Sequence, residues 1–109
     1  MIQDTLSKIE NRIGQSTVQA ESKAELLTLL GTLKSEVAEL SKTHDEEAQS
    51  IAGFTQVSAH EATREEPNPA LVKLSLDGLA ASVDGFEKSH PSLVAIVNRI
   101  CTTLSNLGI

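Results

Sequence analysis

Aromatic side chains are nearly absent from this 109-residue chain, which has two phenylalanines and neither tryptophan nor tyrosine. Proteins that bind single-stranded nucleic acid usually stack bases on aromatic rings, so this shortage argues against that class. The core has to be built from leucine, isoleucine, valine and alanine, and each large aliphatic side chain contributes about 1.5–3 kcal/mol when fully buried. For so small a domain, burial against a second copy is a useful source of further stability.

Basic residues are also scarce. Nine lysines and arginines stand against fifteen aspartates and glutamates, which gives a net charge of −6. Binding to a phosphate backbone needs clustered lysine and arginine. We therefore expect no nucleic-acid partner.

Long apolar runs are missing as well, since no segment approaches the roughly 20 apolar residues that span a bilayer. The first ten residues contain Asp4 and Glu10 in place of the basic start and apolar run of a secretion signal. A single cysteine, Cys101, excludes an internal disulfide, and we interpret it as a small buried apolar residue of a reducing compartment. We expect a cytoplasmic protein without a membrane partner.

Apolar residues repeating at steps of three and four are abundant, and this is the spacing of one face of an α-helix. Three such stripes are Leu26, Leu30, Leu33, Val37 and Leu40; Val72, Leu76, Leu79, Val83 and Phe86; and Leu93, Val97, Ile100, Leu104 and Leu107. Narrow stripes of this kind are the seams by which helices pack on helices. The chain is predicted to be one all-α domain over residues 1–109, a bundle of four to five amphipathic helices that self-associates.

The expected helices span about 2–13, 22–42, 46–64, 69–88 and 91–107. Ser22 and Glu25 match a capping box, which places a helix start at Ser22. Asn68 before Pro69 supplies an N-cap and a first-turn proline. The apolar pattern is weakest in the third helix, so residues 44–66 are expected to be a weaker, more mobile segment.

Small residues accompany the apolar stripe of the fourth helix at Gly78, Ser82 and Gly85. Because glycine costs a helix about 1 kcal/mol relative to alanine, this spacing predicts a neighbouring backbone at close range. An exposed face without packing constraint is the alternative. The last helix has Arg99 as its one charge between residues 93 and 107, so we expect it to be central or covered by another subunit.

The run Phe86-Glu87-Lys88-Ser89-His90-Pro91-Ser92-Leu93, together with the ending Leu107-Gly108-Ile109, resembles a family of small bacterial helical proteins, domain of unknown function 4404. The first helix and the helix at Leu26–Leu40 are similar to that family too. The stretch from about His44 to Glu66 is longer than the usual form of the family. The resemblance implies an all-helical fold and no established activity.

Candidate chemistry is limited to three histidines, His44, His60 and His90, each near carboxylates. Glu87 and His90 have the Glu-x-x-His spacing of di-metal bundles, but the pair straddles a helix break, and a metal centre needs three or four converging ligands. We interpret His90 as a structural residue of the junction and expect His44 and His60 to be solvated. No sequence context places a nucleophile beside a base, so we expect neither enzymatic activity nor a cofactor.

The leading hypothesis is an interaction module that forms a homodimer or binds another protein through its apolar stripes. The predicted interaction seam is Val94, Val97, Ile100, Leu104 and Leu107, met by Leu79, Val83 and Phe86 and by Leu30, Leu33 and Val37. The predicted helix-junction motif is Phe86, Glu87, His90 and Pro91. The alternative is a small metal- or ligand-binding bundle that uses His90 and Glu87, with His60 as a further ligand.

Overall fold

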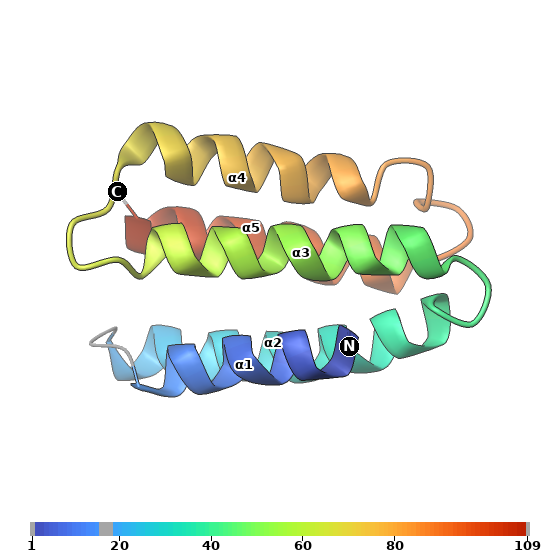
Figure 1. Ribbon diagram of the computed structural model, residues 1–109, viewed down its shortest axis with the longest axis horizontal. Coiled ribbons are helices and arrows are strands. Elements are labelled where there is room, and N and C mark those ends of the chain that lie inside the picture. The colour runs from blue at the N-terminus through green and yellow to red at the C-terminus, as the bar shows by residue number, and fades with distance from the viewer. Residues whose placement is uncertain (1, 16–18, 109) are drawn as a thin grey trace.

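The computed structural model describes residues 2–15 and 19–108, and within these ranges it has five α-helices and no strand. The helices are α1 (Ile2–Gln15), α2 (Ala20–Leu40), α3 (Asp45–Ala62), α4 (Pro69–Ser82) and α5 (Pro91–Gly108). They lie side by side along the long axis of a body that measures 37 × 24 × 22 Å (Figure 1). The predicted all-α bundle is confirmed.

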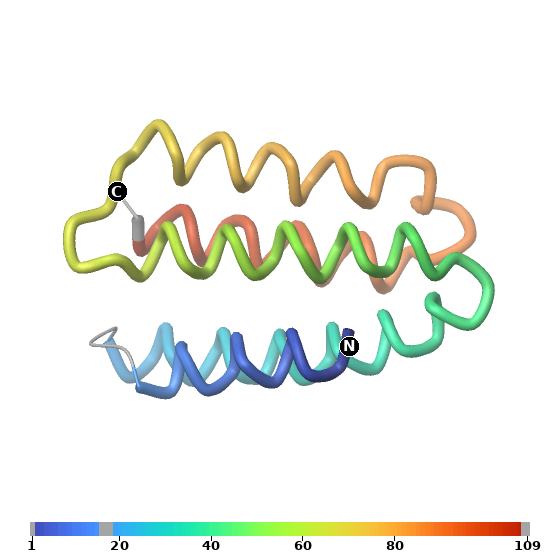
Figure 2. Tube along the Cα trace, in the orientation of Figure 1, coloured from blue at the N-terminus to red at the C-terminus, as the bar shows by residue number. Residues whose placement is uncertain are grey.

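The helices form three layers (Figure 1). Helices α1 and α2 make the lower layer, α3 and α5 the middle layer, and α4 the upper layer. In agreement with this order, α1 packs against α2 and α3, α4 packs against α3 and α5, and α2 packs against α5. The chain reverses direction between each helix and the next (Figure 2), so consecutive helices are antiparallel.

Helix α3 is the centre of this arrangement because it contacts each of the other four helices. Most of its buried residues are small, namely Ala48, Ala52, Thr55, Ser58, Ala59 and Ala62 beside the larger Ile51. Small side chains at a helix contact allow the axes to come closer. The segment with the weakest apolar pattern is therefore a helix, as predicted, and the mobility expected for residues 44–66 stays a prediction.

All three apolar stripes point into the bundle. Leu33, Val37, Leu79, Val97 and Ile100 are fully buried, and buried leucines and isoleucines from α1 complete the core. The expectation that α5 is central is met in part, since α5 packs against α2, α3 and α4. Within the described ranges, no helix is both long enough and apolar enough to cross a bilayer.

Two helix starts were predicted from capping signals, and one of them is wrong. Helix α2 begins at Ala20, its N-cap residue is Gln19, and no side chain caps it. Ala20 and Glu21 are good helix formers, so the helix extends past the expected start at Ser22. The other start is confirmed, because Asn68 Oδ1 accepts a hydrogen bond from the Ala70 N–H at 3.0 Å.

The predicted end of the fourth helix is also wrong, because α4 stops at Ser82 and not near Lys88. The Val83 N–H donates to the Ala80 carbonyl at the end of the helix, and Gly85, in the connection that follows, has a φ of +94°. Glycine adopts this left-handed conformation without the penalty that other residues incur. Phe86 therefore belongs to the α4–α5 connection.

Candidate functional site

The residues of the predicted interaction seam lie between helices of the same chain. Val97, Ile100, Leu104, Leu79 and Val83 are at most 2% exposed, whereas Val94, Phe86 and Leu107 are half-buried against the core. The partners on α2 are Leu30, Leu33 and Val37, which are equally buried. The seam thus forms intramolecular core, and the self-association predicted from it stays a prediction that needs another surface.

The predicted helix-junction motif lies in the connection between α4 and α5. The backbone N–H of His90 donates to the Phe86 carbonyl at 2.8 Å, and the His90 carbonyl accepts from the Val94 N–H in the first turn of α5. The Glu87 carboxylate accepts a hydrogen bond from the Gly85 N–H at 2.9 Å. His90 and Glu87 therefore bond the backbone of the junction, and Pro91 begins α5.

A second histidine joins this junction, and sequence reasoning missed it. His44 precedes α3, and its ring stands edge-on to Phe86, with centroids 5.4 Å apart. Phe86 and His90 stack in the same way at 5.5 Å, and the two imidazole centroids are 6.3 Å apart. Edge-to-face ring pairs of this kind contribute about 0.5–1.5 kcal/mol beyond area burial. The cluster ties the α2–α3 connection to the α4–α5 connection.

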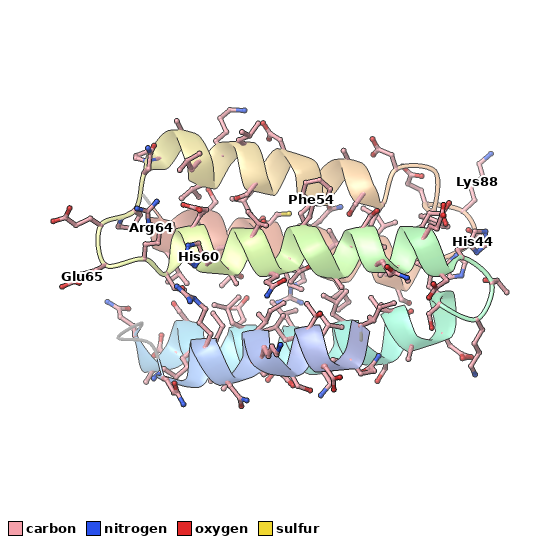
Figure 3. The ribbon with its side chains drawn as sticks, in the orientation of Figure 1. His44, Phe54, His60, Arg64, Glu65 and Lys88 are labelled. Atoms are coloured by element: carbon pink, nitrogen blue, oxygen red, sulfur yellow. The ribbon has the colours of Figure 1, made fainter. Side chains whose placement is uncertain are left out.

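The third histidine lies elsewhere. Figure 3 shows His44 at one end of the bundle and His60 near the other end of α3, where its Nε2 is 3.9 Å from the Glu61 carboxylate. Among the residues that the structure describes, no group of three or more His, Cys, Asp or Glu converges as metal ligands do. The proposed set of His90, Glu87 and His60 is therefore not brought together.

An exposed apolar surface spans α3 and α4 and was not identified from the sequence. Within the described ranges, the large apolar side chains that remain exposed are Phe54 (41%), Val57 (47%), Leu71 (39%) and Leu74 (68%). We call these four residues the α3–α4 apolar face. Leu71 and Leu74 fall outside the Val72–Leu76–Leu79 stripe, so a second apolar line on the same helix was the signal that could have found them.

Phe54 joins the two helices of this face. Its ring lies over Gly78 of α4, and a Cβ added at Gly78 would be 2.6 Å from Phe54 Cδ1. Figure 3 shows Phe54 between the α3 and α4 ribbons. The prediction of a close backbone neighbour at Gly78 is therefore wrong, because the neighbour is an aromatic ring.

Two ion pairs lie on the helices of the α3–α4 apolar face. Lys73 Nζ lies 2.7 Å from Asp77 Oδ2 on the outer side of α4. Arg64 lies 3.0 Å from the Glu61 carboxylate at the end of α3. Both pairs are local, so each is neutral by itself, in a chain whose total charge is −6.

We expect the effect of Gly78→Ala on stability to depend on Phe54. In a Phe54→Ala background the substitution should stabilise the protein by about 1 kcal/mol, the helix propensity difference between glycine and alanine. With Phe54 present the gain should vanish or reverse, because the ring has to leave its place. Urea unfolding followed by circular dichroism measures both values, and Gly31→Ala, in open space on α2, is the control that should gain in either background.

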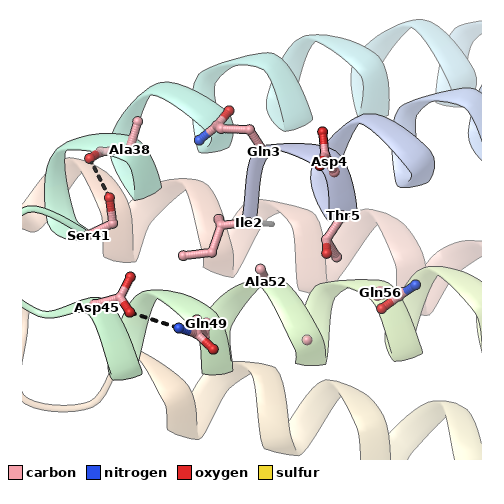
Figure 4. A pocket seen from close by; sticks show the side chains of 11 residues that line it. Ile2, Gln3, Asp4, Thr5, Ala38, Ser41, Asp45, Gln49, Ala52 and Gln56 are labelled. Carbon is pink, nitrogen blue, oxygen red and sulfur yellow. Dashed lines mark hydrogen bonds between the residues drawn. The ribbon is translucent and has the colours of Figure 1, made fainter.

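A groove of about 720 Å³ lies between the start of α1, the end of α2 and α3 (Figure 4). Its lining includes Gln3, Asp4, Thr5, Ser41, Asp45, Gln49 and Gln56, with Ala52 and Gly53 in its wall. The Asp45 carboxylate accepts from the Gln49 amide at 2.7 Å, and the Ser41 hydroxyl donates to the Ala38 carbonyl at 2.8 Å. Because these groups are already bonded within the chain, the groove indicates a ligand less strongly than the apolar face indicates a partner.

A family model described as Domain of unknown function (DUF4404) matches residues 26–109, which include α3 and α4 and the junction motif. No curated protein and no solved structure matches the chain.

Proposed function

This chain belongs to the family described as domain of unknown function 4404, a description that carries no activity. From the surface of the structure, we propose that the protein is a helical interaction module. In this proposal it binds a second copy of itself through the α3–α4 apolar face. The observation that carries the proposal is the exposure of four large apolar side chains on two adjacent helices. Single exposed apolar residues are ordinary, whereas contiguous apolar surface is typical of protein contacts.

A partner would remove the most apolar surface from water at Leu74, which is 68% exposed on the outer layer of the bundle. Apolar surface removed from water contributes roughly 25 cal/mol per Å². Phe54, whose ring lies over Gly78, extends this surface from α4 to α3, so a partner resting on the face would touch both helices. A few well-packed residues near the centre of an interface commonly supply most of the binding energy.

The electrostatics of the face favour a second copy as the partner. Two chains that each carry a net charge of −6 repel one another, and the repulsion is smallest where the contacting surfaces are neutral. Helix α4 carries Lys73 and Asp77 as its charges, and these two side chains already pair. A second copy presents the same neutral, apolar surface, which is the self-complementarity that a two-fold interface needs.

Leu74→Glu is expected to convert the dimer to a monomer. Light scattering coupled to size exclusion, over a hundredfold dilution series, would give the mass of the wild type and the variant. The side chain is exposed, so the fold should survive, and circular dichroism checks that it does. Ala95→Glu is the matched control, since it adds the same charge to an exposed position of α5 and should leave the dimer intact.

A wild-type chain that stays monomeric at every concentration would refute the proposal. So would a Leu74→Glu chain that dimerises as well as the wild type, because the contact would then lie on another surface.

A further inference from the structure

The geometry points to a specific arrangement of the two copies: α4 of one chain packs antiparallel against α4 of the other, around a two-fold axis that passes between Ser75 and Leu76. This inference rests on the self-association proposed above and names the residues that meet in it.

The first argument is the spacing of exposed residues along α4. Ala70, Leu74, Asp77 and Ala81 are all exposed and form the outermost line of the helix. Their steps of four, three and four residues follow one helical face and read the same in either direction along the chain. A two-fold axis at the midpoint of this line therefore superimposes it on itself, with Ala70 opposite Ala81 and Leu74 opposite Asp77 of the second copy.

The second argument is the size of these residues. Small side chains at both ends of the line, Ala70 and Ala81, allow two helices to approach closely over their whole length. Near the axis, the two copies of Leu74 are offset by only about 4.5 Å along the helices, so they contact each other. The most exposed leucine of the chain is thus buried at the centre of the interface.

The third argument is charge. The antiparallel arrangement places Lys73 within about 1.5 Å, measured along the helix axis, of the position opposite Asp77 of the second copy. Both side chains are exposed, at 79% and 62%, so each can reach across while keeping its partner in its own chain. A parallel arrangement would instead set lysine against lysine and aspartate against aspartate. The positions of the positive and negative charges on α4 therefore favour the antiparallel pairing.

Cysteine cross-linking tests the direction of the pairing. In a Cys101→Ser background, which removes the chain's one thiol, we would prepare Ala70→Cys and Ala81→Cys chains of distinguishable mass. In the antiparallel dimer, two copies of residue 70 are about 16 Å apart along the axis, far beyond the Cα–Cα distance of roughly 4–7 Å that a disulfide spans. Residues 70 and 81 lie opposite each other. We expect oxidation to cross-link the mixture and neither chain alone.

The other outcomes separate this inference from the proposal on which it rests. Cross-linking of each variant with itself would overturn the antiparallel arrangement in favour of a parallel one. If no cross-link forms while light scattering still reports dimers, α4 does not lie at the two-fold axis, and the chain dimerises through another surface. Monomers in the Cys101→Ser background and in the wild type would refute self-association itself.

Charge reversal gives an independent test. Lys73→Asp should raise the dissociation constant of the dimer about tenfold, because each of two cross-chain attractions becomes a repulsion. The double variant Lys73→Asp with Asp77→Lys restores opposite charges across the axis and should recover wild-type affinity. Lys42→Asp, which disrupts an exposed pair with Glu39 on another surface, should have no effect. Equal affinity of wild type and Lys73→Asp would overturn the charge argument.

Discussion

Replacing Ile100 by aspartate is expected to unfold the protein. Ile100 is fully buried at the middle of α5, where the helix packs against α2, α3 and α4. A carboxylate there would have no polar partner, and burying an unpaired charge costs several kcal/mol. That penalty, added to the lost aliphatic packing, is comparable with the roughly 5–15 kcal/mol by which a domain of this size is stable.

Circular dichroism and urea unfolding would measure this result, with two companion variants. Ala95→Asp places the same charge on the exposed side of α5 and should leave the unfolding midpoint nearly unchanged. Ile100→Ala removes the packing without adding charge and should lower the free energy of unfolding by about 2–5 kcal/mol. An Ile100→Asp chain with wild-type helicity and midpoint would contradict the position of α5 in the core.

Alkylation of Cys101 near neutral pH is expected to be about a hundredfold slower in the folded protein than in the unfolded chain, because the thiolate is the reactive form. Burial of the side chain, helped by the Asp77 carboxylate, raises the pKa of the Cys101 thiol from 9.0 to about 11. Iodoacetamide labelling with and without urea, followed by mass spectrometry, would measure the ratio. Equal rates in both states would contradict the half-buried position between α4 and α5.

The same pKa shift has a consequence for stability at high pH. The folded state holds the thiol proton more tightly than the unfolded state does, so the thiol contributes to the free energy of unfolding. This contribution is complete below pH 9 and is lost as the pH rises towards about 11. Asp77→Asn is the informative control. Since burial is the larger cause of the shift, this variant should accelerate labelling only slightly.

The helices and the core could be predicted from the sequence because their signal is local. Residues such as Leu30, Leu33 and Val37 repeat at the period of a helix, and a stripe of that period becomes buried whatever it packs against. The same signal cannot identify the chain that supplies the covering helix. Val97 and Ile100 were therefore interpreted as an interface between molecules, although helices of their own chain bury them.

The details that were missed depend on contacts between distant parts of the chain or on single backbone angles. The stripe through Leu79 continues in sequence to Val83 and Phe86, but the helix ends at Ser82, before both residues. Phe54 meets Gly78 across the α3–α4 contact. The α3–α4 apolar face could not be predicted for the same reason, because the exposure of a side chain depends on the positions of all neighbouring helices.

The order of the helices along the chain also bears on how quickly the protein folds. Each helix packs against the one that follows it, and α3, in the middle of the chain, contacts all the others. Most native contacts can therefore form after closing only a short loop, which keeps the entropic cost of the transition state small. Helical bundles rich in local contacts commonly fold in microseconds to milliseconds, so we expect the chain to expose its apolar stripes to other molecules only briefly.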